Sequence, residues 1–180
     1  MTELKLNLGC GNEKLSGWTG IDIVNAPNVD IVAPIEKLPF KDSSATSARA
    51  WNVLEHVPDL NKVLHEVWRV LKPNGEFIIS VPHWSGWLAH YEEHVRSFNL
   101  YSFIDYTKKK RMTSRYGEIA FEIKKRKIIW DKHGIFVYRY LFEWIFNLHP
   151  QLQNLYEQTF LAYLFPAIEI HFTLQAIKKE

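Results

Sequence analysis

Two glycines and one aspartate near the N-terminus have the types and spacing of a nucleotide-binding loop. Gly9-Cys10-Gly11 follows the alternating segment Leu4–Leu8, and Asp22 follows Gly20-Ile21. Glycine lacks a Cβ and adopts positive φ, so backbone N–H groups can approach a ligand closely. A carboxylate after the next strand can accept hydrogen bonds from two ribose hydroxyls. We therefore expect these residues to hold a nucleoside.

The spacing of the loop argues against a dinucleotide. The dinucleotide fingerprint requires a third glycine at position 14, where the chain has Lys14. NAD and FAD are therefore disfavoured as ligands. Taken alone, a Gly-x-Gly pair also fits a plain tight turn.

Three histidines, His83, His90 and His94, follow a predicted buried strand over residues 77–81. Open α/β sheets bind ligands outside the carboxyl ends of their strands, and imidazoles titrate near neutral pH. The three histidines are therefore candidate catalytic bases in an acceptor-site wall over residues 83–98, and each also fits a structural role.

The segment His90-Tyr91-Glu92-Glu93-His94 also matches the His-x-x-Glu-His pattern of some zinc enzymes. On a helix, its two histidines would share a face and could ligate zinc. Gly86 lies close by, however, and no third ligand is marked downstream. We therefore predict no metal site.

The elements that must position these residues alternate between strand and helix in the first half of the chain, which is typical of a parallel α/β sheet. Residues 12–20 are too few for an ordinary crossover helix, so a turn is expected there. Asp59 is expected to cap a helix that runs to about Leu71, where Pro73 and Gly75 would stop it. The strands are predicted near residues 4–8, 20–24, 29–32, 46–53, 77–81, 121–130 and 168–177, with aromatic-rich helices over 135–164.

The length and composition indicate a single globular domain. The chain has 180 residues, which fits one domain over 1–180. Its halves are expected to differ, with residues 1–82 binding a cofactor and residues 83–180 facing a substrate. The single cysteine, Cys10, excludes a disulfide framework and makes a cytoplasmic location the default expectation. No signal peptide or apolar run of about 20 residues is evident.

Five segments together, in their order and spacing, resemble the class I S-adenosylmethionine-dependent methyltransferases, specifically their broad small-molecule "type 11" group. The resemblance implies a Rossmann-like, mostly parallel sheet of six or seven strands flanked by helices, with an antiparallel last strand. It also implies S-adenosyl-L-methionine as the cofactor. The matching segments are Leu6–Gly11, Gly20–Ile23, Leu38–Phe40, Asn52–Val57 and Glu66–Gly75.

The resemblance also implies roles for particular residues. In the family, the glycine loop faces the methionyl part of the cofactor, the acidic residue holds the ribose, and the end of the fourth strand lies beside cofactor and substrate. The implied cofactor-binding residues here are Gly9, Cys10, Gly11, Asp22, Ile23, Ile35, Trp51 and Asn52. Relatives often have an aspartate for the adenine where this chain has Pro34, so Glu36 or a backbone carbonyl is expected to substitute.

The implied reaction is methyl transfer to an O, N or C nucleophile of a small molecule. The basic runs Lys108–Arg111 and Lys124–Lys127 leave an RNA or protein methyltransferase as the alternative, with nucleic acid not favoured. A non-catalytic S-adenosylmethionine-binding protein is the alternative of another class. Glu55-His56 fits either catalysis or fixing the loop before Asp59. The aromatic helices leave peripheral membrane contact and a homodimer open.

Overall fold

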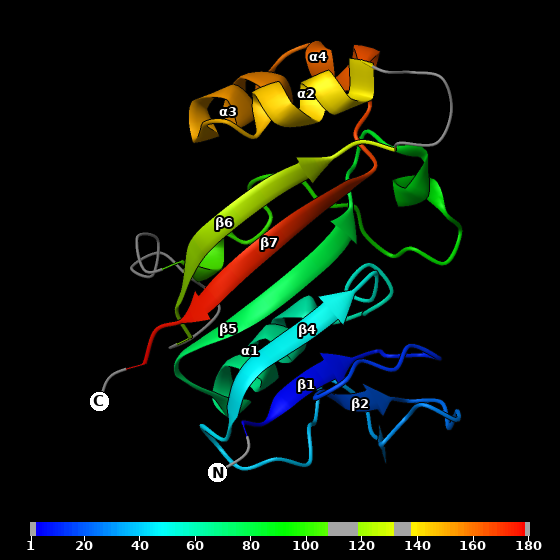
Figure 1. Ribbon diagram of the computed structural model, residues 1–180, viewed down its shortest axis with the longest axis vertical. Coiled ribbons are helices and arrows are strands. Elements are labelled where there is room, and N and C mark those ends of the chain that lie inside the picture. Colours follow the sequence, from blue (N-terminus) through cyan, green and yellow to red (C-terminus); the bar gives the residue numbers. More distant parts are fainter. Residues whose placement is uncertain (1–2, 108–118, 132–137, 179–180) are drawn as a thin grey trace.

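The protein folds around one seven-stranded sheet with the strand order β3-β2-β1-β4-β5-β7-β6 (Figure 1). The computed structural model describes residues 3–107, 119–131 and 138–178. The strands are β1 (Lys5–Leu8), β2 (Thr19–Asp22), β3 (Ile31–Val32), β4 (Ala45–Trp51), β5 (Leu71–Pro82), β6 (Phe121–Ile129) and β7 (Glu169–Ala176).

The directions of the strands confirm the expected mostly parallel sheet. β1 to β5 pair in parallel, whereas β7 runs antiparallel to both β5 and β6. The carboxyl ends of β1, β2, β4 and β5 therefore lie along one edge, which is where such sheets bind ligands. The amino end of β7 reaches the same edge, because Glu169 pairs with Pro82.

The helix α1 (Leu60–Val70) covers the far face of the sheet in Figure 1. The Asp59 carboxylate accepts a hydrogen bond from the Lys62 N–H at 3.1 Å, so it caps the helix as predicted. A buried stripe at helical spacing packs on the sheet: Val63, Leu64, Val67 and Val70.

The end of α1 lies within one residue of the predicted Leu71, but Pro73 and Gly75 are not what ends the helix. The helix stops at Val70, before Pro73 and Gly75, because Leu71 is already extended and pairs with Ala45 of β4. The pairing register shifts after this first pair. Pro73 and Gly75 therefore lie inside an irregular start of β5 instead of ending the helix.

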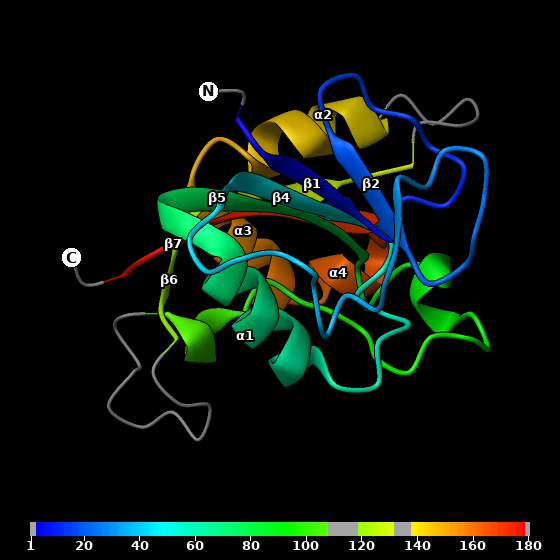
Figure 2. The same ribbon diagram turned by 90° about the horizontal axis from the view of Figure 1, so that it is seen from below.

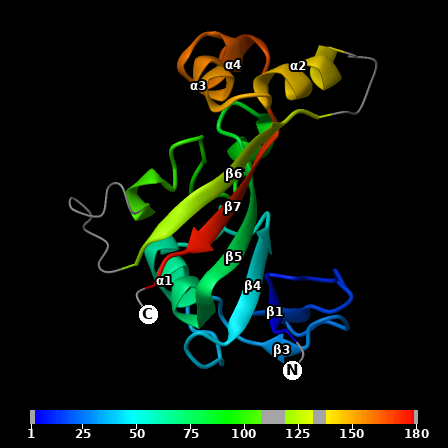
Figure 3. The ribbon, with the colours of Figure 1, turned by 60° about the vertical axis from the view of Figure 1, so that its left-hand side comes forward.

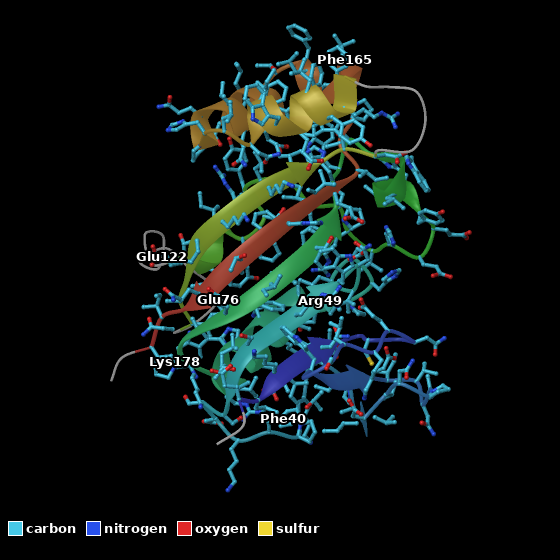
Figure 4. All side chains as sticks on the ribbon, viewed as in Figure 1. Phe40, Arg49, Glu76, Glu122, Phe165 and Lys178 are labelled. Atoms are coloured by element: carbon cyan, nitrogen blue, oxygen red, sulfur yellow. The ribbon has the colours of Figure 1, made fainter. Side chains whose placement is uncertain are left out.

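The two faces of the sheet are unlike. In the face toward α1, strand residues such as Ala48, Phe77 and Phe172 are buried. The opposite face, within the described chain, carries no helix over β1 to β5 (Figures 1 and 2). Arg49 of β4 and Glu76 of β5, labelled in Figure 4, lie on this face. Residues 9–18 form turns and no helix, which confirms the predicted loss of the first crossover helix.

Three helices form a cap beyond the end of β6, on the side away from β1 and β3 (Figure 3). They are α2 (Tyr138–Phe146), α3 (Pro150–Gln158) and α4 (Leu161–Leu164), which confirms the aromatic helical insertion. His149 caps α3 at the predicted interruption. The rings of Trp130 and Tyr156 meet edge to face, with centroids 5.0 Å apart, in the core of this cap.

One buried carboxylate ties the cap to the loop that follows β5. Glu157 of α3 lies 3.1 Å from Nε2 of His83 and also accepts hydrogen bonds from Trp84 Nε1 and the Leu100 N–H. Burial raises the pKa of Glu157, but the hydrogen bonds and charge of His83 outweigh it and hold the pKa below its ordinary value. The loop after β5 is therefore fixed by an ionised group.

The described residues contain no helix long and apolar enough to cross a bilayer. Of the two basic runs, Lys108–Arg111 lies outside the described residues. The other run lies on the edge strand β6, where Lys124 and Lys125 are exposed and Lys127 pairs with Glu143 of α2 at 2.8 Å. Lysines on an edge strand oppose pairing with another sheet.

Replacing Glu157 should destabilise the fold. Glu157→Gln removes the charge that three buried donors share, and we expect a loss of about 3 kcal/mol in the free energy of unfolding, measured by urea denaturation. Because the folded pKa of Glu157 is lowered, its contribution is present above the ordinary value of 4.5 and is lost as the pH falls through the folded pKa. The difference in the free energy of unfolding between wild type and Glu157→Gln should therefore become smaller as the pH is lowered.

The matched control is Glu122→Gln on β6, whose carboxylate is exposed and 3.6 Å from Lys124. We expect it to change stability by less than about 0.5 kcal/mol. Equal stability losses in the two variants would show that Glu157 is not the tie between cap and loop.

Candidate cofactor and acceptor site

The glycine loop follows β1 at the ligand-binding edge of the sheet. Gly9 has φ of +62°, and an added Cβ would lie 2.5 Å from Cγ2 of Val53, so only glycine fits there. Gly11 has φ of +51°, but no atom lies within 4 Å of its missing Cβ. Gly9 is thus required by the fold, whereas Gly11 borders open space.

The carboxylate of Asp22 orders this loop. Oδ2 accepts a hydrogen bond from the Gly11 N–H at 2.8 Å, and Oδ1 accepts one from the Val24 N–H at 3.0 Å. A carboxylate can accept about four hydrogen bonds. Asp22 is only partly buried, so its remaining lone pairs are available to ribose hydroxyls. Cys10 is buried beside it, and burial raises the pKa of its thiol, as expected for a packing residue.

Asp30 is a further structural residue of this region that the sequence analysis missed. Its carboxylate accepts hydrogen bonds from Lys14 Nζ at 2.6 Å and from the Gly20 N–H at 2.7 Å, and these lower its pKa. Lys14 stands where a dinucleotide-binding loop has its third glycine. Through Asp30 it helps to hold β2 in place, and it does not form part of a pyrophosphate-binding turn. No local sequence signal marks this pairing across 16 residues.

An apolar rim adjoins Asp22. Ile23 is 70% exposed, and Val24 and Val32 are also exposed at the ends of β2 and β3. Exposed apolar side chains grouped at a site indicate a surface that a ligand covers. Ile35, by contrast, is buried in the core. Glu36 lines a groove with residues of α1.

Trp51 and Asn52 end β4, as the resemblance requires. The Trp51 ring lies between the Arg49 guanidinium, 4.5 Å from its centroid, and the His171 ring, at 4.6 Å. Asn52 has φ of +52°, which asparagine tolerates better than most residues. Its Nδ2 donates to Glu169 at 3.1 Å, whereas its buried Oδ1 has no partner among the described residues.

Glu169, at the start of β7, is a second residue that the sequence analysis missed. His171 and the Ser80 hydroxyl lie 3.1 Å from its Oε2. The hydrogen bond from His171 in particular holds the pKa of Glu169 below its ordinary value. Glu55 is buried near it, and burial together with the charge of Glu169 raises the pKa of Glu55 to about 7.

The three predicted histidines have separate environments. His83 is fully buried, with Ser85 on Nδ1 at 2.7 Å and Glu157 on Nε2. His90 is exposed at the end of a short 3₁₀ turn. His94 is partly buried, its ring centroid is 4.6 Å from that of His56, and its Nδ1 is buried without a partner.

These features fit the expected cofactor. A nucleoside with an amino-acid tail needs a glycine cradle, a carboxylate, an apolar surface and polar groups near its charged end. The loop at Gly11, the carboxylate of Asp22 and the rim at Ile23 supply the first three. The unpartnered Oδ1 of Asn52 supplies a hydrogen-bond acceptor.

Comparison with known proteins agrees with this geometry over residues 6–79. Residues 6–79 match the family model described as a methyltransferase domain. A sterol 4-C-methyltransferase of Caenorhabditis elegans is 45% identical over 69 residues, which are 38% of this chain and 20% of that protein. The ubiquinone/menaquinone biosynthesis C-methyltransferase UbiE of Rickettsia prowazekii is 48% identical over 48 residues, 27% of this chain and 19% of that protein.

The fold likeness extends further than the sequence likeness. A geranyl diphosphate C-methyltransferase from Streptomyces coelicolor A3(2), crystallised with Mg²⁺, geranyl diphosphate and S-adenosyl-L-homocysteine, aligns with a TM-score of 0.58 at 14% identity. The alignment covers 97% of this chain and 74% of that one. Residues 6–79 thus match the methyltransferase-domain family model, and the chain as a whole shares the fold of solved S-adenosylmethionine-dependent methyltransferases.

Proposed function

We propose that the protein transfers the methyl group of S-adenosylmethionine to a small, largely apolar acceptor molecule. The observation that carries the proposal is the glycine loop ordered by Asp22 at the carboxyl edge of the sheet, inside the segment matched by the methyltransferase family. The cofactor half, residues 1–82, would bind the donor, and residues 83–180 would face the acceptor.

Two features support an apolar acceptor. The curated relatives are named for sterol and quinone methylation. The cap also exposes large apolar side chains on its surface, among them Trp144, Phe160 and Tyr163. Exposed apolar groups of this size indicate contact with apolar molecules or surfaces. Such a surface also favours peripheral contact with a membrane over nucleic-acid binding.

The chain's own residues act mainly by positioning. The bound donor supplies an electrophilic methyl group on a sulfonium. Gly11 and Asp22 hold the nucleoside, and Asn52, fixed by the ionised Glu169, offers its Oδ1 to the charged end. Holding donor and acceptor in line can supply most of the rate enhancement. His94 is the histidine whose free Nδ1 suits it to accept a proton from the acceptor.

Ligand binding and turnover test the proposal separately. Calorimetry should show binding of S-adenosylhomocysteine and none of NAD. Incubation with labelled S-adenosylmethionine and isoprenoid, sterol or quinone precursors should then label an organic-soluble product. Binding without transfer to any acceptor class, RNA and protein included, would favour the non-catalytic alternative. Binding of NAD alone would overturn the proposal.

A pair of glycine variants separates the ligand contact from backbone strain. Gly11→Ala and Gly17→Ala both place alanine at positive φ with open space around the Cβ. Each should therefore lose about 1 kcal/mol of stability. Only Gly11→Ala should weaken S-adenosylhomocysteine binding, by about tenfold or more, as measured by calorimetry. Equal affinities would place the ligand elsewhere.

Removing the charge of Asp22 should weaken donor binding. Asp22→Asn loses acceptor capacity toward two ribose hydroxyls. We expect it to lose about 2–3 kcal/mol of binding free energy, which is a decrease of roughly 30–150-fold in affinity for the donor. Asp59→Asn is the matched control, because asparagine also caps helices and Asp59 lies outside the loop. An Asp22→Asn affinity within about twofold of wild type would mean that Asp22 only orders the loop.

Replacing each of the three histidines within residues 83–98 should have a different effect, because their environments differ. His94→Ala should lower turnover while leaving S-adenosylhomocysteine affinity and the melting temperature nearly unchanged. His83→Ala should lower the melting temperature instead, because it removes the ion-pair partner of the buried Glu157 at a cost of about 3 kcal/mol. His90→Ala should change neither strongly. Unchanged turnover in His94→Ala would remove it from the acceptor wall.

A further inference from the structure

A second cluster of chemical groups lies where the segment after β4 meets the loop after β5. The Val95 N–H donates to the Glu55 carbonyl at 2.9 Å, and Arg96 donates to the carbonyls of Val57 and Pro58. These bonds join two segments about 40 residues apart in the chain. They bring His94 against Glu55 and His56.

The polar atoms in this cluster lack partners. Both carboxylate oxygens of Glu55, which is 1% exposed, have no hydrogen-bond partner among the described residues. The buried Nδ1 of His94 has none either. Buried polar groups are almost always paired, and an unpaired one costs about 1–3 kcal/mol. Three such atoms gathered in one place indicate a missing shared partner.

The three side chains can share one ion. One ligand atom from each of Glu55, His56 and His94 lies within 4.8 Å of the others. Ligands of tetrahedral zinc at 2.0–2.1 Å are about 3.3 Å apart, so these atoms would have to approach one another by at most about 1.5 Å. His56 is exposed and can supply movement. Its Nδ1 lies 3.3 Å from the Glu93 carbonyl, the kind of contact that orients metal-binding histidines.

We propose that Glu55, His56 and His94 form a binding site for a divalent first-row transition metal ion, with zinc as its probe. Two imidazoles and one carboxylate suit zinc, iron or cobalt, whereas magnesium prefers oxygen alone. Three protein ligands leave a coordination position for water or an oxygen of the acceptor. Bound in this way, the Nδ1 of His94 serves the ion and not a proton.

The site differs from the His-x-x-Glu-His pattern, because it takes His94 but neither His90 nor the Glu93 side chain. This difference gives matched controls. It also replaces the sequence-based expectation of no metal with one from geometry. The proposal does not rest on methyl transfer, because metal binding is measured without the donor.

The experiment titrates chelator-stripped protein with Zn²⁺ by calorimetry and with Co²⁺ by visible absorption. One ion per chain should bind, with the absorption of a tetrahedral Co²⁺ complex, and Mg²⁺ should not compete. Loss of a supporting partner of a metal ligand costs about 10–100-fold in affinity. Glu55→Gln, His56→Ala and His94→Ala should each lose at least as much, and His90→Ala and Glu93→Gln should bind as wild type.

Two results would overturn the proposal. Absence of stoichiometric Zn²⁺ or Co²⁺ binding in the folded wild-type protein would mean that water fills the cluster. Binding lost in His90→Ala or Glu93→Gln but kept in Glu55→Gln would place the ion elsewhere. Because His56 is exposed, His56→Ala keeps the test decisive if the variants at the less exposed positions fail to fold.

Discussion

The hydrogen bonds to the ionised Glu157 are the interaction on which the arrangement of residues 83–178 depends. Glu157 lies in the cap, yet its hydrogen-bond donors come from the loop after β5, at His83, Trp84 and Leu100. A buried carboxylate without these donors would be strongly disfavoured. The cap and the loop must therefore form together. Gly86 strengthens the same junction, because an added Cβ would lie 2.2 Å from the Ala167 carbonyl oxygen.

The bare polar face of the sheet follows from the short first crossover. With turns and no helix between β1 and β2, the face opposite α1 has no cover in the described chain, and apolar side chains there would be exposed. The sequence accordingly places Arg49, Glu76 and Gln175 on that face. The Arg49–Glu13 ion pair at 2.7 Å ties the glycine loop to it. This ion pair thus holds the glycine loop against the sheet, a contact that a crossover helix would otherwise provide.

Local patterns predicted the parts of the fold that depend on neighbours in sequence. Alternating apolar residues located the strands, and Asp59 located the start of α1. The end of α1 was predicted to within one residue, but the pairing of Leu71 with β4 ends the helix before Pro73 and Gly75 are reached. Asp22 was singled out by its spacing as a ribose ligand, which stays a prediction, whereas its hydrogen bonds from the Gly11 and Val24 N–H groups were not foreseen.

The residues that the sequence could not reveal act over long distances in the chain. Asn52 and Glu169 are 117 residues apart, and His83 and Glu157 are 74 apart. No periodicity or motif encodes such pairs, because they form only when distant segments are brought together in the folded protein. Folding also gives different surroundings to the three histidines His83, His90 and His94, which the sequence analysis had treated as one group.

The electrostatics of the acceptor edge depend on two unlike carboxylates. Glu169 is held ionised by His171, Asn52 and Ser80, whereas burial and the charge of Glu169 raise the pKa of Glu55 to about 7. A raised folded pKa means that the favourable contribution of protonated Glu55 is present below its ordinary value of 4.5 and is lost as the pH rises through about 7.

Burial, followed by repulsion from His56, lowers the pKa of His94, so a neutral imidazole faces Glu55 at the same pH. A proton on Glu55 or a cation between the two side chains therefore relieves the same unbalanced negative charge. The ionised Glu169 is fixed by three hydrogen-bonding groups, so the net charge of this region depends on the protonation of Glu55. A cation at this cluster would therefore compete with a proton for Glu55.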